Sequence, residues 1–169
     1  MTDFLVLPVR EAVAWIRAWT DHAWPITLQE AFTIRDHLGW TPAPDNGRFF
    51  TTKLSTDNQE DGSIDRVGDH GVPGVSLPLT SRGRLQDKAV CAPIAHAAHI
   101  DYVNALIALW GPGQDKGERD GVWEHRWVLP NQVSVTLTGT DTNIGTDVDS
   151  PHETQAYELE LYYKEKGYE

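Results

Sequence analysis

The chain has 169 residues, of which 40% are hydrophobic and 23% are charged, so it is long and apolar enough to fold around a core. Its 25 acidic residues outnumber its 14 Lys and Arg, which gives a net charge of −11. This balance argues against a nucleic-acid binder and against docking on anionic lipid, because both need excess Lys and Arg. It permits a basic partner. The single cysteine, Cys91, excludes an intramolecular disulfide and a Cys-rich zinc site.

No segment has the features of a signal peptide or of a membrane span. The uncharged stretch from Phe4 to Pro8 lacks a basic segment before it and is too short to be a signal sequence. No run approaches the ~20 apolar residues that cross a bilayer. Together with the single cysteine, these features indicate a cytoplasmic protein. We expect residues 1–169 to form a single domain.

Two helices are expected near the N-terminus. Apolar residues at helical spacing predict a helix from about Pro8 to His22. Thr27 and Glu30 match a capping box, in which each side chain accepts a free backbone N–H at the helix start. This pattern predicts a second helix that begins after Thr27 and ends at Gly39.

The middle of the chain combines short strands with a polar loop. Phe49 to Leu54 is typical of a strand, and Ser55 to Gly74 is expected to be a long exposed loop. Apolar residues alternate from Val75 to Thr80, which predicts a strand that Pro78 confines to an edge or a bulge. A third helix is expected within residues 87–110, followed by a charged loop over residues 114–120.

The last third of the chain is predicted to be β. Residues 123–129 and 133–138 alternate between apolar and polar, and residues 157–163 show the same alternation after the turn-rich segment 139–151. In the resulting sheet, Val133, Val135, Leu137, Tyr157, Leu159 and Leu161 are expected to face the helices. Helices segregated from antiparallel hairpins indicate an α+β fold, with an antiparallel sheet and helices packed on one face.

The sequence contains no recognisable catalytic or cofactor-binding motif. His96 and His99 are three apart on the third predicted helix, without the Glu and the spacing of His-Glu-x-x-His zinc sites, so we expect no metal and no cofactor. Asp141–Asn143 and Asp147–Asp149 offer alternating oxygen ligands to calcium as a lesser option, although the EF-hand order is absent.

The acidic residues are the candidate partner-binding residues. Between Gly139 and Leu161 there are six acidic residues and no Lys or Arg. Solubility is the simpler explanation. The sharper one is electrostatic complementarity to a basic protein, which speeds association and selects the partner. The expected contact residues are Asp141, Asp147, Asp149 and Glu153, with a second set, Asp57, Glu60, Asp61 and Asp65, in the loop at 55–74.

The spacing of several tryptophans, leucines and glycines resembles that of a known family. The frame comprises Trp15 to Trp24, Leu28-x-x-Ala31, Leu38-Gly39-Trp40, Leu109-Trp110-Gly111-Pro112 and Val133-x-Val135-x-Leu137. It is similar to an uncharacterised family of small actinobacterial proteins, some of which are encoded near secreted polymorphic toxins. The resemblance spans most of the chain and carries no catalytic residues.

Two functions follow from these observations. The resemblance, the acidity and the missing catalytic motif favour a non-catalytic binding protein, namely an immunity protein that occludes a cognate toxin with a basic active cleft. The alternative is a small enzyme or ligand-binding domain that uses the helix with His96 and His99, or a pocket lined by some of the seven tryptophans.

Overall fold

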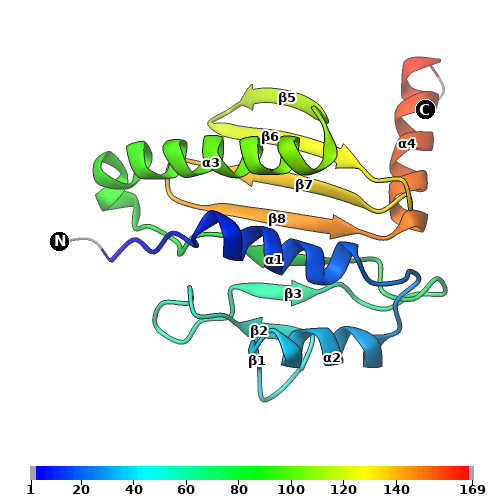
Figure 1. Ribbon diagram of the computed structural model, residues 1–169, viewed down its shortest axis with the longest axis horizontal. Helices are drawn as coiled ribbons and strands as arrows, with labels where there is room; N and C mark the ends of the chain where they lie inside the picture. Colours follow the sequence, from blue (N-terminus) through cyan, green and yellow to red (C-terminus); the bar gives the residue numbers. More distant parts are fainter. Residues whose placement is uncertain (1–2, 168–169) are drawn as a thin grey trace.

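The computed structural model describes residues 3–167, which fold into one antiparallel sheet with the first three helices on one face (Figure 1). The helices are α1 (Val9–Thr20), α2 (Leu28–His37), α3 (Lys88–Trp110) and α4 (Pro151–Glu165), and the short 3-10 turn η1 spans Leu85–Asp87. The first three agree with the predicted helices. The capping box is present, with Glu30 N donating to Thr27 Oγ1 at 3.1 Å and Thr27 N donating to Glu30 Oε1 at 3.2 Å.

Eight strands form the sheet in the order β1-β2-β3-β4-β8-β7-β6-β5. The chain builds one half of the sheet, crosses it with α3, builds the other half, and returns to the centre with β8. The strands are β1 (Thr41–Pro42), β2 (Phe49–Thr51), β3 (Gly62–Ile64), β4 (Gly74–Pro78), β5 (Gln114–Arg119), β6 (Val122–Val128), β7 (Ser134–Gly139) and β8 (Ile144–Asp149). The predicted α+β class is confirmed.

The core lies between the sheet and the layer formed by α1 and α3 (Figure 1). Val133, Val135 and Leu137 are fully buried, as predicted from their alternation. Tyr102 of α3 fixes the helix above the sheet, since its hydroxyl donates to Leu7 O at 2.6 Å and Leu79 O at 3.0 Å.

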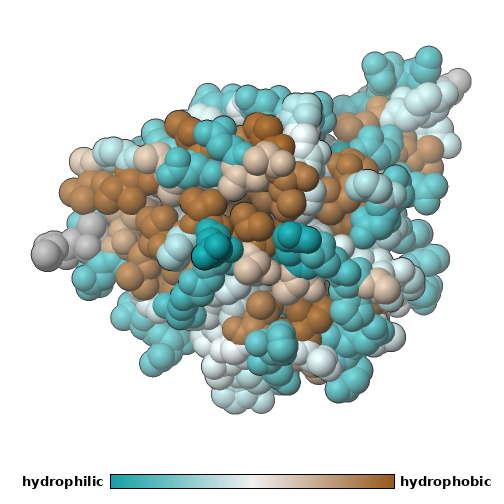
Figure 2. Space-filling view, viewed as in Figure 1, coloured by the Kyte–Doolittle hydropathy of each residue, from teal (hydrophilic) through white to brown (hydrophobic). Residues whose placement is uncertain are grey.

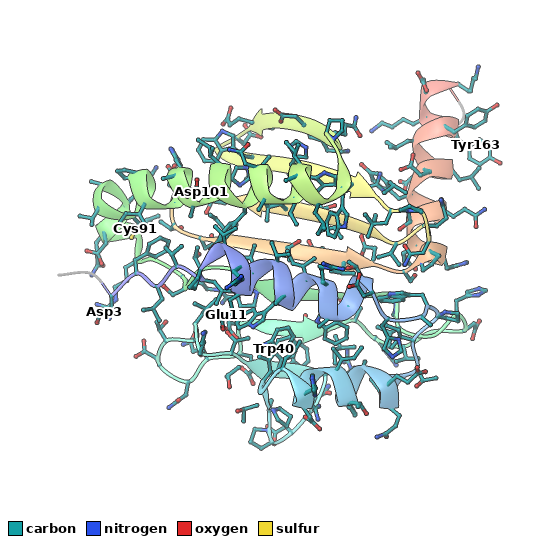
Figure 3. The ribbon with its side chains drawn as sticks, viewed as in Figure 1. Asp3, Glu11, Trp40, Cys91, Asp101 and Tyr163 are labelled. Atoms are coloured by element: carbon teal, nitrogen blue, oxygen red, sulfur yellow. The ribbon has the colours of Figure 1, made fainter. Side chains whose placement is uncertain are left out.

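The aromatic residues of the first two helices extend this core to the short strands. Trp40, labelled in Figure 3, stacks on Phe50 of β2 with ring centroids 4.6 Å apart, and meets Trp15 edge-on at 5.2 Å. These aromatic rings therefore serve packing. Cys91 of α3 is also buried.

The C-terminal segment differs from its prediction. Residues 157–163 belong to helix α4, so Tyr157, Leu159 and Leu161 do not face the core and are 37%, 49% and 41% exposed. The reason is local: Ser150 accepts a hydrogen bond from Glu153 N at 3.1 Å, and Pro151 occupies the first helical position, where it needs no N–H partner. α4 stands at one end of the sheet (Figure 1).

Three other segments contain strands that the sequence analysis assigned to loops or turns. The expected charged loop at 114–120 contains β5, the exposed loop at 55–74 contains β3, and the turn-rich segment 139–151 contains β8. The edge position expected for β4 is also wrong, because β4 lies between β3 and β8. Pro78 is tolerated because β3 pairs only with Val75 and Ser76, which leaves Pro78 paired on the β8 side alone.

The helix-covered surface is rich in apolar residues along α3 (Figure 2), where Val90, Ile94 and Ile100 are exposed. Over its whole length α3 contains a single acidic residue, Asp101. The acidic excess must therefore lie on other surfaces. Among residues 3–167, no helix has both the length and the apolar character that crossing a membrane requires.

Candidate functional site

The alternation of β8 distributes its residues between the two faces of the sheet. Ile144, Thr146 and Val148 are buried on the helix-covered face. Asp147 and Asp149 therefore point to the opposite, open face, because successive side chains of a strand alternate.

A groove of about 530 Å³ lies between this open face and α4. Among the residues that the structure describes, its carboxylates come from six acidic residues and its cations from Lys116 and Arg126. The acidic residues are Asp65, Glu124, Asp147, Asp149, Glu153 and Glu160. We call this feature the acidic groove.

Helix α4 forms one wall of the acidic groove although it has few buried contacts. Thr154 is its one buried residue among those that the structure describes, and its hydroxyl donates to the hydroxyl of Ser134 at 2.9 Å. Glu153, Tyr157 and Glu160 repeat at helical spacing, so they share the face that lines the groove.

The two cations of the groove are both engaged by α4. The Arg126 guanidinium donates to Glu158 and lies 4.5 Å from the centre of the Tyr157 ring. Lys116 Nζ donates to the Tyr157 hydroxyl at 2.8 Å. Because the side chain of Arg126 is 9% exposed, little of its charge reaches the solvent. The groove thus keeps a strong excess of negative charge.

Burial, together with this excess of negative charge, raises the pKa of two groove carboxyls. Burial, together with the nearby charges of Asp147, Asp65 and Glu153, raises the pKa of Asp149 to about 6, and Arg126 offsets only part of that rise. The pKa of Asp65 is raised as well, first by its partial burial and then by the negative charges of Asp147 and Glu153. Ionising these groups in the folded protein therefore costs free energy that a positively charged partner would recover.

Four of the eight predicted partner-binding residues thus meet in one place: Asp65, Asp147, Asp149 and Glu153. The other four do not line the acidic groove. Asp61 precedes β3 whereas Asp65 follows it, so the two lie about 13 Å apart along the strand. Asp61 accepts hydrogen bonds from Thr52 N at 2.8 Å and Thr52 Oγ1 at 2.7 Å, a contact that closes the loop. Asp57 and Glu60 are exposed on that loop.

Asp141 pairs with residues of α3. Its carboxylate lies 2.7 Å from His96 Nε2 and 3.3 Å from Lys88 Nζ. These contacts, the hydrogen bond with His96 first, lower the pKa of Asp141. These two contacts tie the turn between β7 and β8 to α3. They also compensate the charge of Asp141.

The histidines of α3 are not arranged as a metal site. His96 meets Trp123 edge-on at 4.3 Å, in addition to its pairing with Asp141. His99 has a buried Nδ1 with no hydrogen-bond partner among the residues that the structure describes. Within the same range, no set of three or more His, Cys, Asp or Glu side chains is placed to hold a metal ion.

Sequence reasoning missed several residues of the acidic groove: Lys116, Glu124, Arg126, Tyr157 and Glu160. A usable signal exists for Glu124 and Arg126, because both alternate with the apolar residues of β6 and so fall on the open face. The α4 residues could be placed only after the helix start at Ser150 had been recognised.

Residues 10–150 match the family described as "Family of unknown function (DUF6301)". The chain belongs to this family. The matched range includes the sheet and the groove residues up to Asp149, whereas α4 lies beyond it. No match was found among curated proteins or solved structures.

Proposed function

We propose that this DUF6301 protein is a non-catalytic binding protein whose acidic groove receives a basic surface of a partner protein, and that the partner is a toxin which it blocks as an immunity protein. The observation that carries the proposal is the convergence of Asp65, Asp147, Asp149 and Glu153 in one groove. These residues come from three separate parts of the chain.

The groove is suited to a cationic partner because its own cations are occupied. Arg126 and Lys116 are held by α4, so six carboxylates remain with little compensating charge. Arg or Lys side chains from a partner would stabilise the ionised carboxylates and favour association. An anionic ligand, including a nucleic acid, would be repelled.

Solubility alone accounts poorly for this arrangement. Acidic residues that serve solubility work best when fully exposed and separated. Asp147 and Asp149 are instead partly buried, and the raised pKa of Asp149 shows that its charge disfavours the folded state. A protein that retains such a cost gains from it elsewhere, and partner binding is the gain that the groove supports.

The identity of the partner class rests on the resemblance described in the sequence analysis. Some proteins with that frame of tryptophans, leucines and glycines are encoded near secreted polymorphic toxins. A toxin that acts on nucleic acids or nucleotides needs a basic active cleft, and an acidic protein can fill such a cleft. No tryptophan lines the acidic groove, so this site does not favour the ligand-binding alternative.

The test is binding to the protein encoded by the neighbouring gene. The wild-type chain and the variant Asp147→Asn/Asp149→Asn/Glu153→Gln are compared by surface plasmon resonance between about 0.05 and 0.5 M NaCl. We expect the variant to lose at least about tenfold in affinity, with slower association, and the salt dependence to weaken. Growth of cells that express the toxin should be rescued by the wild-type chain and not by this groove variant.

A matched control removes three charges elsewhere, in Asp3→Asn/Asp45→Asn/Asp101→Asn, and should bind as the wild-type chain does. The loop variant Asp57→Asn/Glu60→Gln tests the second predicted set separately. Equal binding by the groove variant and the wild-type chain, with an affinity that is insensitive to salt, would overturn the proposal.

A further inference from the structure

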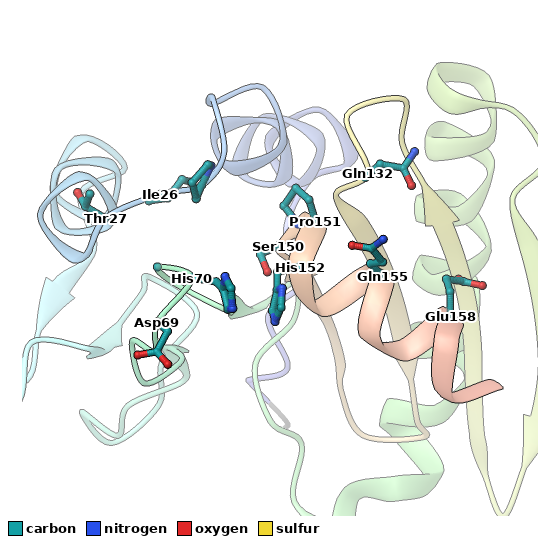
Figure 4. A pocket seen from close by; sticks show the side chains of 12 residues that line it. Ile26, Thr27, Asp69, His70, Gln132, Ser150, Pro151, His152, Gln155 and Glu158 are labelled. Atoms are coloured by element: carbon teal, nitrogen blue, oxygen red, sulfur yellow. The ribbon is translucent and has the colours of Figure 1, made fainter. Parts of the chain in front are cut away.

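A second cleft, of about 750 Å³, lies against a different face of α4 from the acidic groove (Figure 4). It is bounded by residues 25–27 between α1 and α2, by residues 69–71, and by the first turns of α4. His152, Gln155 and Glu158 contribute from α4, roughly two fifths of a turn round the helix from the residues that line the groove. We call it the anchor cleft.

The anchor cleft continues along α4. A neighbouring hollow of about 420 Å³ shares His152, Gln155 and Glu158 with it and extends to Leu159 and Tyr162. These last two side chains lie one helical turn apart and are 49% and 52% exposed. An apolar trough therefore runs from the loops at one end of the molecule along an exposed helix.

The chemistry of this trough selects an apolar group with positive charge around it. One wall is a flat pair of aromatic rings, since His70 and His152 stack with centroids 3.7 Å apart (Figure 4). Among residues 3–167, Asp69 and Glu158 are the only carboxylates that line it, and no Lys or Arg does. Because Glu158 pairs with Arg126, the negative charge of the trough comes mainly from Asp69. A second copy of this acidic chain or an anionic ligand would be repelled here.

We propose that the anchor cleft receives a bulky apolar side chain of the same basic partner whose Arg or Lys residues occupy the acidic groove, so that the partner straddles α4. This inference rests on the proposed function. The partner segment is therefore amphipathic, and its cation and its apolar anchor are separated by the width of a helix, about 10–12 Å. Anchors of this kind dominate the energy of protein interfaces because a pocket removes them fully from water.

The test uses two fluorescein-labelled synthetic peptides, one with a central Trp flanked by Lys and Arg and one with Ser in place of that Trp. Fluorescence anisotropy measures the binding of each to the full chain. We expect the wild-type chain to bind the Trp peptide about tenfold more tightly than the Ser peptide. Gln155→Trp, which fills the cleft, should reduce this ratio to about one. Leu159→Gln, which removes an apolar wall of the neighbouring hollow, should lower the ratio as well.

Leu161→Gln is the matched control, because Leu161 is 41% exposed on the same helix but lines neither hollow. This variant should keep the tenfold preference. The groove variant Asp147→Asn/Asp149→Asn/Glu153→Gln should weaken both peptides alike and leave their ratio unchanged.

The outcomes separate the two proposals. If the wild-type chain binds both peptides equally and the groove variant loses both, the anchor cleft is refuted while the acidic groove stands. If neither peptide binds the wild-type chain, both proposals fail. If sedimentation shows a dimer that Leu159→Gln abolishes and Leu161→Gln retains, the trough is an interface between copies of this chain and the anchor inference is wrong.

Discussion

Asp65 and Asp149 bring their carboxylates together over Gly74. A Cβ at that glycine would lie 2.7 Å from Asp149 Oδ1 and 3.1 Å from Asp65 Oδ2. Asp65 follows β3 and Asp149 ends β8, with β4 between them. The missing side chain of Gly74 is therefore what allows two like charges to approach each other across the middle strand.

We expect Asp149→Asn to stabilise the protein at pH 7 by about 1 kcal/mol, after allowance for solvent screening of a group that remains partly exposed. The pKa of Asp149 is raised from 3.8 to about 6 on folding, so the folded state binds its proton more tightly than the unfolded state does. Wild-type stability from this group thus falls as pH rises from about 4 to about 6. Urea unfolding across that range should show the variant's advantage vanish near pH 4.

The exposed Asp3 provides the control, since Asp3→Asn should change the free energy of unfolding little at pH 7. A stabilised Asp149→Asn that also binds the partner less well would show stability exchanged for function. An Asp149→Asn variant that is no more stable at pH 7 than at pH 4, relative to wild type, would contradict the electrostatic account of the groove.

We expect Gly74→Ala to destabilise the protein by about 1–3 kcal/mol, because the new methyl group would meet backbone as well as carboxylates. Besides the two carboxylate oxygens, Val148 O would lie only 2.8 Å from it, and a β-ladder carbonyl cannot move aside. Gly145→Ala on β8 is the control, since a Cβ at Gly145 would lie 3.4 Å from its nearest neighbour, Leu77 O, which is an ordinary contact distance. Urea denaturation of the two variants gives the comparison, and equal losses would refute the packing argument.

Local patterns were enough to predict the first three helices and the buried face of β7. The capping residues of α2 and the alternation of Val133, Val135 and Leu137 each depend on a few neighbouring residues, and the structure confirms them. The convergence of Asp65 with Asp149 could not be predicted in this way. It depends on β8 returning to pair with β4, a long-range choice that no local pattern encodes.

The error at α4 has a different cause. Tyr157, Leu159 and Leu161 alternate with Glu158 and Glu160, which is typical of a strand with one buried face. Because α4 buries little beyond Thr154, its apolar residues do not repeat at the spacing typical of a helix with one buried face. The capping signature at Ser150, Pro151 and Glu153 was the informative signal.

We expect His99→Gln to reduce the loss of stability that the protein suffers in mild acid. Burial, and the neighbouring His125, lower the pKa of His99, so the unfolded state binds its proton more readily than the folded state. The contribution of His99 to stability is therefore lost as pH falls below its ordinary pKa of 6.5. Thermal unfolding from pH 7 to pH 5 should show a flatter profile for the variant.

The same pH range contains the opposite effect of Asp149, so each variant isolates one of two opposing contributions. The double variant His99→Gln/Asp149→Asn should be nearly additive, since the two residues lie on opposite faces of the sheet. A wild-type profile that His99→Gln leaves unchanged would mean that folding does not lower the pKa of His99.

The last prediction concerns how α4 is held in place. We expect Thr154→Val to cost about 1–2 kcal/mol, because it leaves the hydroxyl of Ser134, which is 1% exposed, without its donor. Hydrogen exchange should then accelerate for the amides of α4 and change little in β7 and β8. Thr33→Val is the control, since the Thr33 hydroxyl donates to Gln29 O on exposed α2 and its loss should leave exchange unaltered. Unchanged protection of α4 in Thr154→Val would show that Arg126 and Lys116 suffice to hold the helix against the sheet.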